Sequence, residues 1–257
     1  MGHNGKNLRA MSKDPIECVI FDKDGTLIEC ASLWIPWVED MYEYLAATIS
    51  QSIFSYEELA RSFGIRPGNE SIDPKGPLAI GSVAEGGTIL SMKLYETGIP
   101  WDLAVLLASE AVEHADGRQN ESPSIRRIEG VKECIESLQR KNIKMGVLTA
   151  DDTLKAERHL KAVGLDRYFD FIIGSDQTER GKPFPDMAYL ASEKHGFALA
   201  NTLMIGDTNA DMRLGKHAGM RSSIGFIPAT EEKKDYLLDA DMVIDHFEFK
   251  LIEPYFN

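Results

Sequence analysis

The chain has 257 residues, of which 43% are hydrophobic, and this is enough to bury one large domain or a core with an inserted lobe. Its formal net charge of −13 argues against a broad nucleic-acid surface, which needs a basic field, and no apolar run is long enough to span a bilayer. A small anionic substrate is compatible with this charge, because a bound divalent cation can dominate the field inside one pocket.

The first 14 residues are expected to form a mobile tail, and they lack the apolar segment of a secretion signal. The three cysteines, Cys18, Cys30 and Cys134, have neither a metal-type spacing nor the even number typical of a disulfide framework. We therefore expect a reduced, cytoplasmic setting.

A buried strand is predicted over residues 16–21, because the run IECVIF is apolar and rich in β-branched side chains. Residues 32–63 carry apolar side chains at helical spacing and predict two helices. Residues 64–87 are rich in glycine and proline and predict a long loop. Helical spacing resumes over residues 88–97 and 101–115.

The polar stretch 116–124 is expected to be a connector that closes a mostly helical insert over residues 31–121. A core of residues 15–30 and 122–257 surrounds this insert, and in its second part strands and helices alternate. Strands are expected at 144–148, 171–173, 202–205, 222–225 and 242–244, and helices at 129–141, 153–163, 185–195 and 209–217. The alternation predicts an α/β fold with a doubly wound, Rossmann-like parallel sheet.

Ligands of such sheets collect beyond the carboxyl ends of the strands, so the residues that follow each strand are the candidates for a site. Asp22 and Asp24 follow the first strand, and in an extended segment residues two apart point to the same side. Two carboxylates at one site indicate a division of labour: Asp22 as nucleophile and Asp24 as general acid and base. A solvated turn is the alternative, whereas a calcium loop lacks its later glutamate here.

Three further strand ends carry polar groups. Thr149 and the backbone amide of Ala150 could hold phosphate oxygens, although a simple helix cap or turn is the alternative. Lys182 could offset the charge of a phosphate, although a lone loop lysine is more often solvated. Asp207 and Asp211 lie four residues apart and could share one side of a helix start, although a capping role is the alternative.

Taken together, these groups suit one chemistry. An oxygen-rich carboxylate site suits Mg²⁺, and phosphoryl transfer needs charge neutralisation, positioning and a nucleophile in line. The four strand ends therefore predict a magnesium-dependent phosphoryl-transfer site.

The same residues resemble the four motifs of the haloacid dehalogenase-like superfamily, in its phosphatase branch. The motifs are matched by the run Asp22 to Thr26, by Thr149, by Lys182, and by Gly206-Asp207 with Asp211. The place of the helical insert resembles the type-one cap of the phosphoglycolate phosphatase-like and β-phosphoglucomutase-like subgroup.

The resemblance implies a role for each matched residue. Asp22 would be the nucleophile, Asp24 the acid and base, and Thr149, Ala150 and Lys182 would bind the phosphoryl group. Mg²⁺ would be held by the side chains of Asp22 and Asp207 and by the backbone carbonyl of Asp24. Asp211 would orient Lys182 or a metal-bound water.

One departure concerns the residues after Thr149, where Ala150-Asp151 replaces the polar amide or serine of many relatives. The backbone amide of Ala150 is left to serve at that position.

The resemblance implies hydrolysis of a small phosphorylated metabolite through an aspartyl-phosphate. Dehalogenases of the superfamily lack the second aspartate and phosphonatases carry a small residue there, so Asp24 speaks against both. A phosphomutase and a catalytically silent metal- or phosphate-binding relative are the alternatives. Neither a nucleic-acid nor a membrane partner is expected, and the substrate and the oligomeric state do not follow from these residues.

Within the insert, Trp34 and Trp37 are expected to belong to its core rather than to a substrate pocket. Arg66, Lys75 and Lys93 are its candidates for holding an anionic leaving group, although a solvated role is more common for each.

Overall fold

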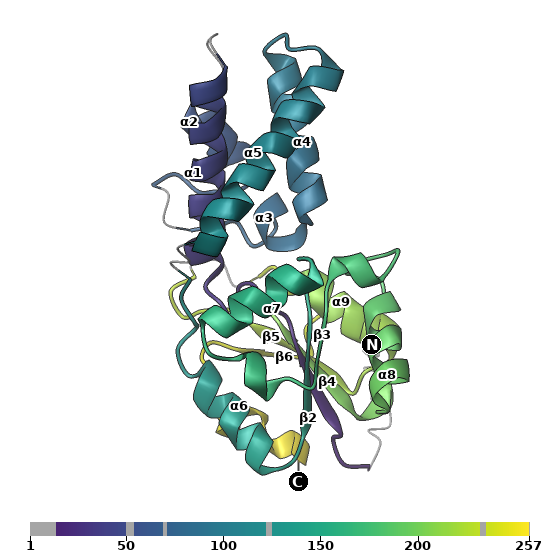
Figure 1. Cartoon of the computed structure of the whole chain (residues 1–257). Helices are drawn as coiled ribbons and strands as arrows, with labels where there is room; N and C mark the ends of the chain where they lie inside the picture. Colours follow the sequence, from purple (N-terminus) through teal and green to yellow (C-terminus); the bar gives the residue numbers. More distant parts are fainter. Residues whose placement is uncertain (1–13, 50–53, 69–70, 122–124, 232–234, 257) are drawn as a thin grey trace, which may run out of the picture.

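The computed structural model describes residues 14–49, 54–68, 71–121, 125–231 and 235–256. A sheet flanked by helices forms one part of the molecule, and a group of helices stands above it (Figure 1). Apart from Asp14, the expected N-terminal tail lies outside the described residues.

Six parallel strands form the sheet, in the order β3-β2-β1-β4-β5-β6. Their bounds are β1 Cys18–Phe21, β2 Lys144–Leu148, β3 Phe171–Ile173, β4 Thr202–Gly206, β5 Ser222–Phe226 and β6 Met242–Ile244. This arrangement confirms the predicted α/β class with a doubly wound, Rossmann-like parallel sheet. Strand order reverses between β1 and β4, and β1 is paired on its other edge with β2.

Helices cover both faces of the sheet. Val19 and Phe21 of β1 pack against α6 (Val131–Arg140), α7 (Thr153–Ala162) and the C-terminal helix α10 (Phe249–Ile252). The alternate strand residues Cys18 and Ile20 pack against α8 (Asp186–His195) and α9 (Asn209–Ala218). Short 3₁₀ turns lie at Asp166–Tyr168, Ser175–Gln177, Leu199–Asn201 and Glu253–Phe256. Strands that are apolar on both sides are what a sheet with two covered faces requires.

The upper helices, which we call the cap helices, share a hydrophobic core of their own. They are α1 (Cys30–Thr48), α2 (Tyr56–Ser62), α3 (Pro77–Ile80), α4 (Val83–Glu96) and α5 (Trp101–Glu121). Trp37 is buried in this core and meets Phe63 edge to face, with 6.0 Å between the ring centroids. The cap boundaries placed at residues 31 and 121 stay a prediction.

The predicted loop over residues 64–87 is wrong in its second half. Helix α3 begins with a proline at its first turn, where the missing N–H costs nothing, and α4 begins after a capping box formed by Ser82 and Glu85. Gly86 packs against the cap core, because a Cβ there would lie 3.3 Å from the Phe63 ring. The glycines that suggested a loop therefore allow close packing of a helix.

The predicted connector over residues 116–124 is also wrong, because α5 continues to Glu121; residues 122–124 lie outside the described part. Asp116 accepts a hydrogen bond from Trp37 Nε1 at 2.9 Å, and Gln119 donates to the Leu33 carbonyl oxygen at 2.8 Å. These contacts with α1 hold a polar helix end that local sequence does not favour. Every helix of the described chain is too short or too polar to cross a membrane.

Candidate active site

The site lies at the switch point of the sheet, where ligands of doubly wound folds bind. Phe21 and Ile205 are paired across β1 and β4, and the Asp22 amide donates to the Ile205 carbonyl oxygen at 2.8 Å. Asp22 and Asp207 therefore leave neighbouring strands at the same edge. The parallel register alone brings together two carboxylates that are 185 positions apart in the numbering of the chain.

Gly25 is required where the first loop turns beneath Asp207. Its φ is +83°, and a Cβ at this position would lie 2.0 Å from Asp207 Oδ2. The next residue, Thr26, donates from its hydroxyl to Asp207 Oδ1 at 3.1 Å. The first loop can therefore approach Asp207 this closely only with a glycine at position 25.

Lys182 joins two buried carboxylates of the site. Its ammonium pairs with Asp22 and lies 2.6 Å from Asp211 Oδ1. Burial, aided by the charges of Asp211 and Asp24 and opposed by Lys182, raises the pKa of Asp22 to about 7. Burial disfavours the Lys182 ammonium, but Asp211 and Asp22 outweigh it and raise the pKa of Lys182. One ammonium is thus held between two buried carboxylates.

Asp211 is fixed by the start of α9. Thr208 is the N-cap residue, and its backbone N–H and hydroxyl donate to Asp211 Oδ2 at 3.0 and 2.6 Å. Asp207 precedes the cap residue, so the alternative in which Asp207 itself caps the helix is wrong. This reciprocal cap leaves Asp211 Oδ1 to meet Lys182.

Thr149 and Ala150 border the same cavity as Asp22, Asp24 and Lys182. The Thr149 amide is used by the sheet, since it donates to the Ile173 carbonyl oxygen at 3.1 Å. Its hydroxyl oxygen accepts from the Asp151 amide at 3.1 Å, which leaves the O–H free to donate. The geometry therefore offers phosphate a hydroxyl donor from Thr149 and not its backbone amide.

The cavity beside Asp22 is small, with a volume of about 30 Å³, and the cap helices close it. Cap residues on its wall are Trp34, Leu78, Ala79, Ile80, Gly81 and Val83. The wall from the core is polar and charged, whereas these cap residues carry no ionisable side chain. The cavity is thus divided into an ionic half and an apolar half.

Comparison with known proteins agrees with this geometry. A family model described as haloacid dehalogenase-like hydrolase matches residues 16–219. The chain belongs to the haloacid dehalogenase-like hydrolases. The match spans β1 to the end of α9 and contains all four of the motifs, so the family resemblance inferred from them is confirmed.

Several relatives of this hydrolase are known by name. It is 24% identical over 234 residues to the phosphorylated carbohydrates phosphatase of Thermotoga maritima, covering 89% of this chain and 93% of that protein. It is 33% identical over 96 residues to the pyrophosphatase PpaX of Halalkalibacterium halodurans, covering 37% of this chain and only 45% of that protein. The chain thus matches less than half the length of the pyrophosphatase.

A solved structure shares the fold of the hydrolase. A crystal structure of a predicted phosphoglycolate phosphatase from Haemophilus somnus superposes with a TM-score of 0.72 and 17% identity, covering 94% of this chain and 99% of that one. At this identity the likeness concerns the fold alone.

The donor set of the hydrolase fits a magnesium ion. Oxygen atoms of Asp22, Asp207 and Asp211 lie within 4.8 Å of one another, and all three residues are buried. Burial and the charges of Asp22 and Asp211 raise the pKa of Asp207 well above its ordinary value, so the carboxylates lack sufficient positive charge nearby. Carboxylate oxygens are the ligands that Mg²⁺ prefers. The role expected for the Asp24 carbonyl stays a prediction.

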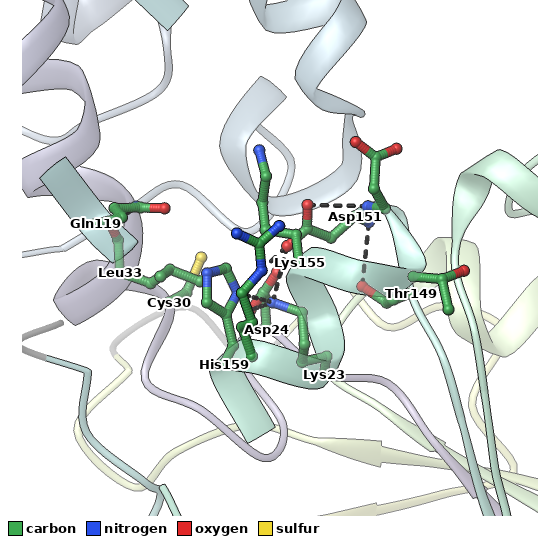
Figure 2. Close-up of polar contacts among 12 residues, drawn as sticks. Lys23, Asp24, Cys30, Leu33, Gln119, Thr149, Asp151, Lys155 and His159 are labelled. Carbon is green, nitrogen blue, oxygen red and sulfur yellow. Dashed lines mark hydrogen bonds and ion pairs between the residues drawn. The ribbon is translucent and has the colours of Figure 1, made fainter. Parts of the chain in front are cut away.

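The sequence did not predict a second charged cluster, which surrounds Lys23 (Figure 2). The Lys23 ammonium lies 2.5 Å from Asp24 Oδ1, 3.2 Å from His159 Nδ1 and 3.4 Å from Asp151 Oδ2. One signal could have revealed it: Asp151, Lys155 and His159 recur at intervals of four, the spacing of one helix face.

The three cap cations proposed from the sequence do not border the cavity beside Asp22. Arg66 instead pairs with Glu231 of the core at 2.9 Å, and Lys93 pairs with Glu96 at 3.0 Å. Trp34 and Trp37 both lie in the cap core, as expected, and Trp34 also borders the cavity.

Proposed function

We propose that this chain is a magnesium-dependent phosphatase that hydrolyses a small phosphate monoester through an aspartyl-phosphate on Asp22. The observation that supports this proposal is that Asp22, Asp24 and Lys182 border one cavity. A nucleophile, a proton donor and a cation for the phosphoryl oxygens are the parts that such a reaction needs.

The first step forms a bond between an Asp22 carboxylate oxygen and phosphorus. The bond from phosphorus to the ester oxygen breaks, and Asp24 gives its proton to the leaving oxygen, which departs as an alcohol. In the second step water attacks the same phosphorus, Asp24 takes up the water proton, and inorganic phosphate leaves Asp22. Atoms and charges balance, and Asp24 ends each cycle as it began.

The remaining groups bind and orient the phosphoryl group. Lys182 and the Thr149 hydroxyl would hold its oxygens, and Asp211 keeps Lys182 in place. Mg²⁺, held by Asp22, Asp207 and the Asp24 carbonyl, would neutralise the charge of the phosphoryl group when bound.

The apolar cap residues of the cavity wall restrict which leaving groups fit the site. Leu78, Ile80 and Val83 offer a leaving group no charge, and the buried Trp34 Nε1 has no hydrogen-bond partner among the described residues. A carboxylate on the leaving group would lose its hydration at this wall without gaining a cation, whereas an uncharged alcohol would not. We therefore propose a compact, uncharged alcohol as the leaving group.

The cytoplasmic location is part of the proposal and rests on the reduced setting expected for Cys18, Cys30 and Cys134. All three are free in the structure, and Cys18 and Cys134 are buried.

The test is phosphate release from a panel of monoesters, with Mg²⁺ and with chelator. The panel includes glycerol 3-phosphate and 3-phosphoglycerate, which differ chiefly in the charge of the leaving group. Asp22→Asn is the inactive variant, because it removes the nucleophile with little change in volume. Asp166→Asn, an exposed aspartate, is the matched control.

Phosphate release that needs Mg²⁺ and Asp22, and that is faster from glycerol 3-phosphate, would support the proposal. Equal rates for wild type and Asp22→Asn would overturn it. Conversion of a sugar phosphate without phosphate release would indicate a mutase, and no conversion of any substrate would indicate a silent relative.

A further inference from the structure

Lys23 stands between the two catalytic aspartates and is fully buried, with 0% of its side chain exposed. A buried ammonium is costly unless each of its three N–H bonds has an acceptor. Three acceptors surround it: Asp24 Oδ1, His159 Nδ1 and Asp151 Oδ2. Figure 2 shows these side chains converging on the lysine: Asp24 from the first loop, Asp151 from just before α7, and His159 from α7 itself.

The two partners on the α7 side are themselves fixed. Asp151 Oδ1 accepts from the Asp152 amide at 2.9 Å, which leaves Oδ2 to face Lys23 and His159. Burial acts to raise the pKa of Asp151, but nearby positive charge, that of Lys23 foremost, outweighs it and lowers the value to about 2. Burial and Lys23 lower the pKa of His159, and Nδ1 of the neutral ring accepts from the lysine in the tautomer that carries its proton on Nε2.

Asp24 is the member of the cluster that takes part in the proposed reaction. Within the described chain, Asp24 and Asp151 border the cavity beside Asp22, but Lys23 does not. The Trp34 ring of α1 lies over the ammonium, with 5.8 Å from Nζ to the ring centroid. The ammonium is therefore enclosed by protein groups on the cap side and has no path to a substrate phosphate.

We propose that Lys23 is a positioning residue for proton transfer: anchored by Asp151 and His159, its ammonium holds Asp24 Oδ1 and so aims Oδ2 at the leaving oxygen. The inference rests on the phosphatase function proposed above. A carboxyl side chain can rotate about two bonds, and a charge-assisted hydrogen bond to one oxygen removes most of that freedom. Asp151 and His159 act indirectly, because they hold Lys23, which in turn holds Asp24.

The test exploits how strongly a leaving group needs a proton. Glycerol leaves as an alcohol only if it is protonated, whereas p-nitrophenolate leaves without a proton. Lys23→Met keeps the length of the side chain and removes the ammonium. The double variant Lys23→Met with Asp151→Asn removes the ammonium together with the charge of Asp151, so this fully buried carboxylate is not left without its partner. The control is Lys161→Met, which removes the ammonium of an exposed lysine on α7, the helix that carries His159.

For both Lys23 variants we expect kcat on glycerol 3-phosphate to fall about tenfold or more, and kcat on p-nitrophenyl phosphate to fall less than about threefold. KM should change little on either substrate. Because a loss of folded protein lowers both rates equally, the ratio of the two is insensitive to a purely structural defect.

Equal losses on the two substrates, or no loss on either, would overturn the positioning role while leaving the phosphatase function intact. A wild-type chain that releases phosphate from neither substrate would overturn the proposed function and this inference with it.

Discussion

Two buried lysines accompany the catalytic aspartates, and they differ in what their ammonium groups can reach. Lys182 pairs with Asp22 and Asp211 and borders the cavity, with 6% of its side chain exposed. Lys23 pairs with Asp24 and Asp151 and has no exposure. Each lysine therefore pairs with two carboxylates. Access to the cavity, and not pairing, separates a lysine that can bind phosphate from one that can act only through a neighbour.

The partners of the two lysines follow the same division. Asp22 and Asp211 share one ammonium, and with Asp207 they form a cluster short of positive charge, which suits a divalent cation. Around Lys23, two carboxylates and a histidine meet the ammonium directly. We call Lys182 with Asp22, Asp207 and Asp211 the Lys182 side of the site, and this side can bind ions. The Lys23 side, made of Lys23, Asp24, Asp151 and His159, has its ammonium contacted by protein groups alone.

Removing the ammonium of Lys182 should have the largest effect. We expect Lys182→Met to lower kcat/KM about 10²–10³-fold, because a donor to the phosphoryl oxygens is lost. Inhibition by inorganic phosphate should weaken in parallel, whereas Lys23→Met should keep phosphate inhibition near the wild-type value. Steady-state kinetics with phosphate as inhibitor make this measurement. Equal weakening in both variants would break the distinction between the two lysines.

Magnesium should stabilise the protein through the Lys182 side alone. At a concentration 100 times its Kd, a ligand of the folded state adds about 2.7 kcal/mol. For a chain of this size the gain corresponds to a rise in Tm of about 5–10 °C. Asp207→Asn should abolish the rise and Asp151→Asn should retain it, as measured by calorimetry with KCl at matched ionic strength. A rise that persists in Asp207→Asn would contradict the assigned ligands.

Acid should weaken the Lys23 side through Asp151, which faces Lys23, His159 and Lys155. Its pKa is lowered to about 2 in the folded protein, so its contribution is complete above its ordinary value and is lost as pH falls. The loss should amount to about 2 kcal/mol of unfolding free energy between about pH 4 and pH 2.

Urea unfolding at a series of pH values tests this contribution. Asp151→Asn should lack this part of the acid dependence, and Asp166→Asn should keep it. Asp22 and Asp207 have raised pKa values, so their contribution to the free energy of unfolding changes with pH in the opposite direction. Both residues are present in wild type and in both variants, so their contribution is the same in all three curves. Parallel curves for wild type and Asp151→Asn would exclude the Asp151 contribution.

The smallest effect is expected where the Lys23 side meets the cap. Lys155 of α7 pairs with Asp116 of α5 at 2.8 Å, and their side chains are 10% and 27% exposed. A double-mutant cycle with Lys155→Met and Asp116→Asn should give a coupling of up to about 1 kcal/mol that falls with salt. The more exposed pair of Arg118 and Asp40 within the cap is the control cycle. No coupling would mean that this pair does not hold the cap helices.

Much of the ionic half of the site could be predicted because its residues directly follow apolar runs. Parallel strands end at one edge, so Asp22 and Asp207 were expected at the same edge once both runs were taken as strands. The surroundings of Lys23 could not be predicted in this way. A lysine beside a motif is ordinarily solvated, and its partner His159 is 136 positions away in the chain.

The cap helices show the same limit for the fold. Gly86 indicates a loop by composition, yet the space it leaves is filled by Phe63, which belongs to another segment. Arg66 suggested a substrate contact, yet its partner is Glu231, 165 positions away. The local sequence predicts whether a segment is helix or loop only where side chains from distant parts of the chain do not decide how the segment packs.

The edge-to-face contact of Trp34 with Trp37, with 5.4 Å between ring centroids, has a spectroscopic consequence. The chain has three tryptophans, and the third, Trp101, begins α5. All of them therefore belong to the cap helices, and the parallel sheet contributes none. Selectively excited tryptophan emission should report on the cap alone, with Trp34 sensing the charge of Lys23 beneath it.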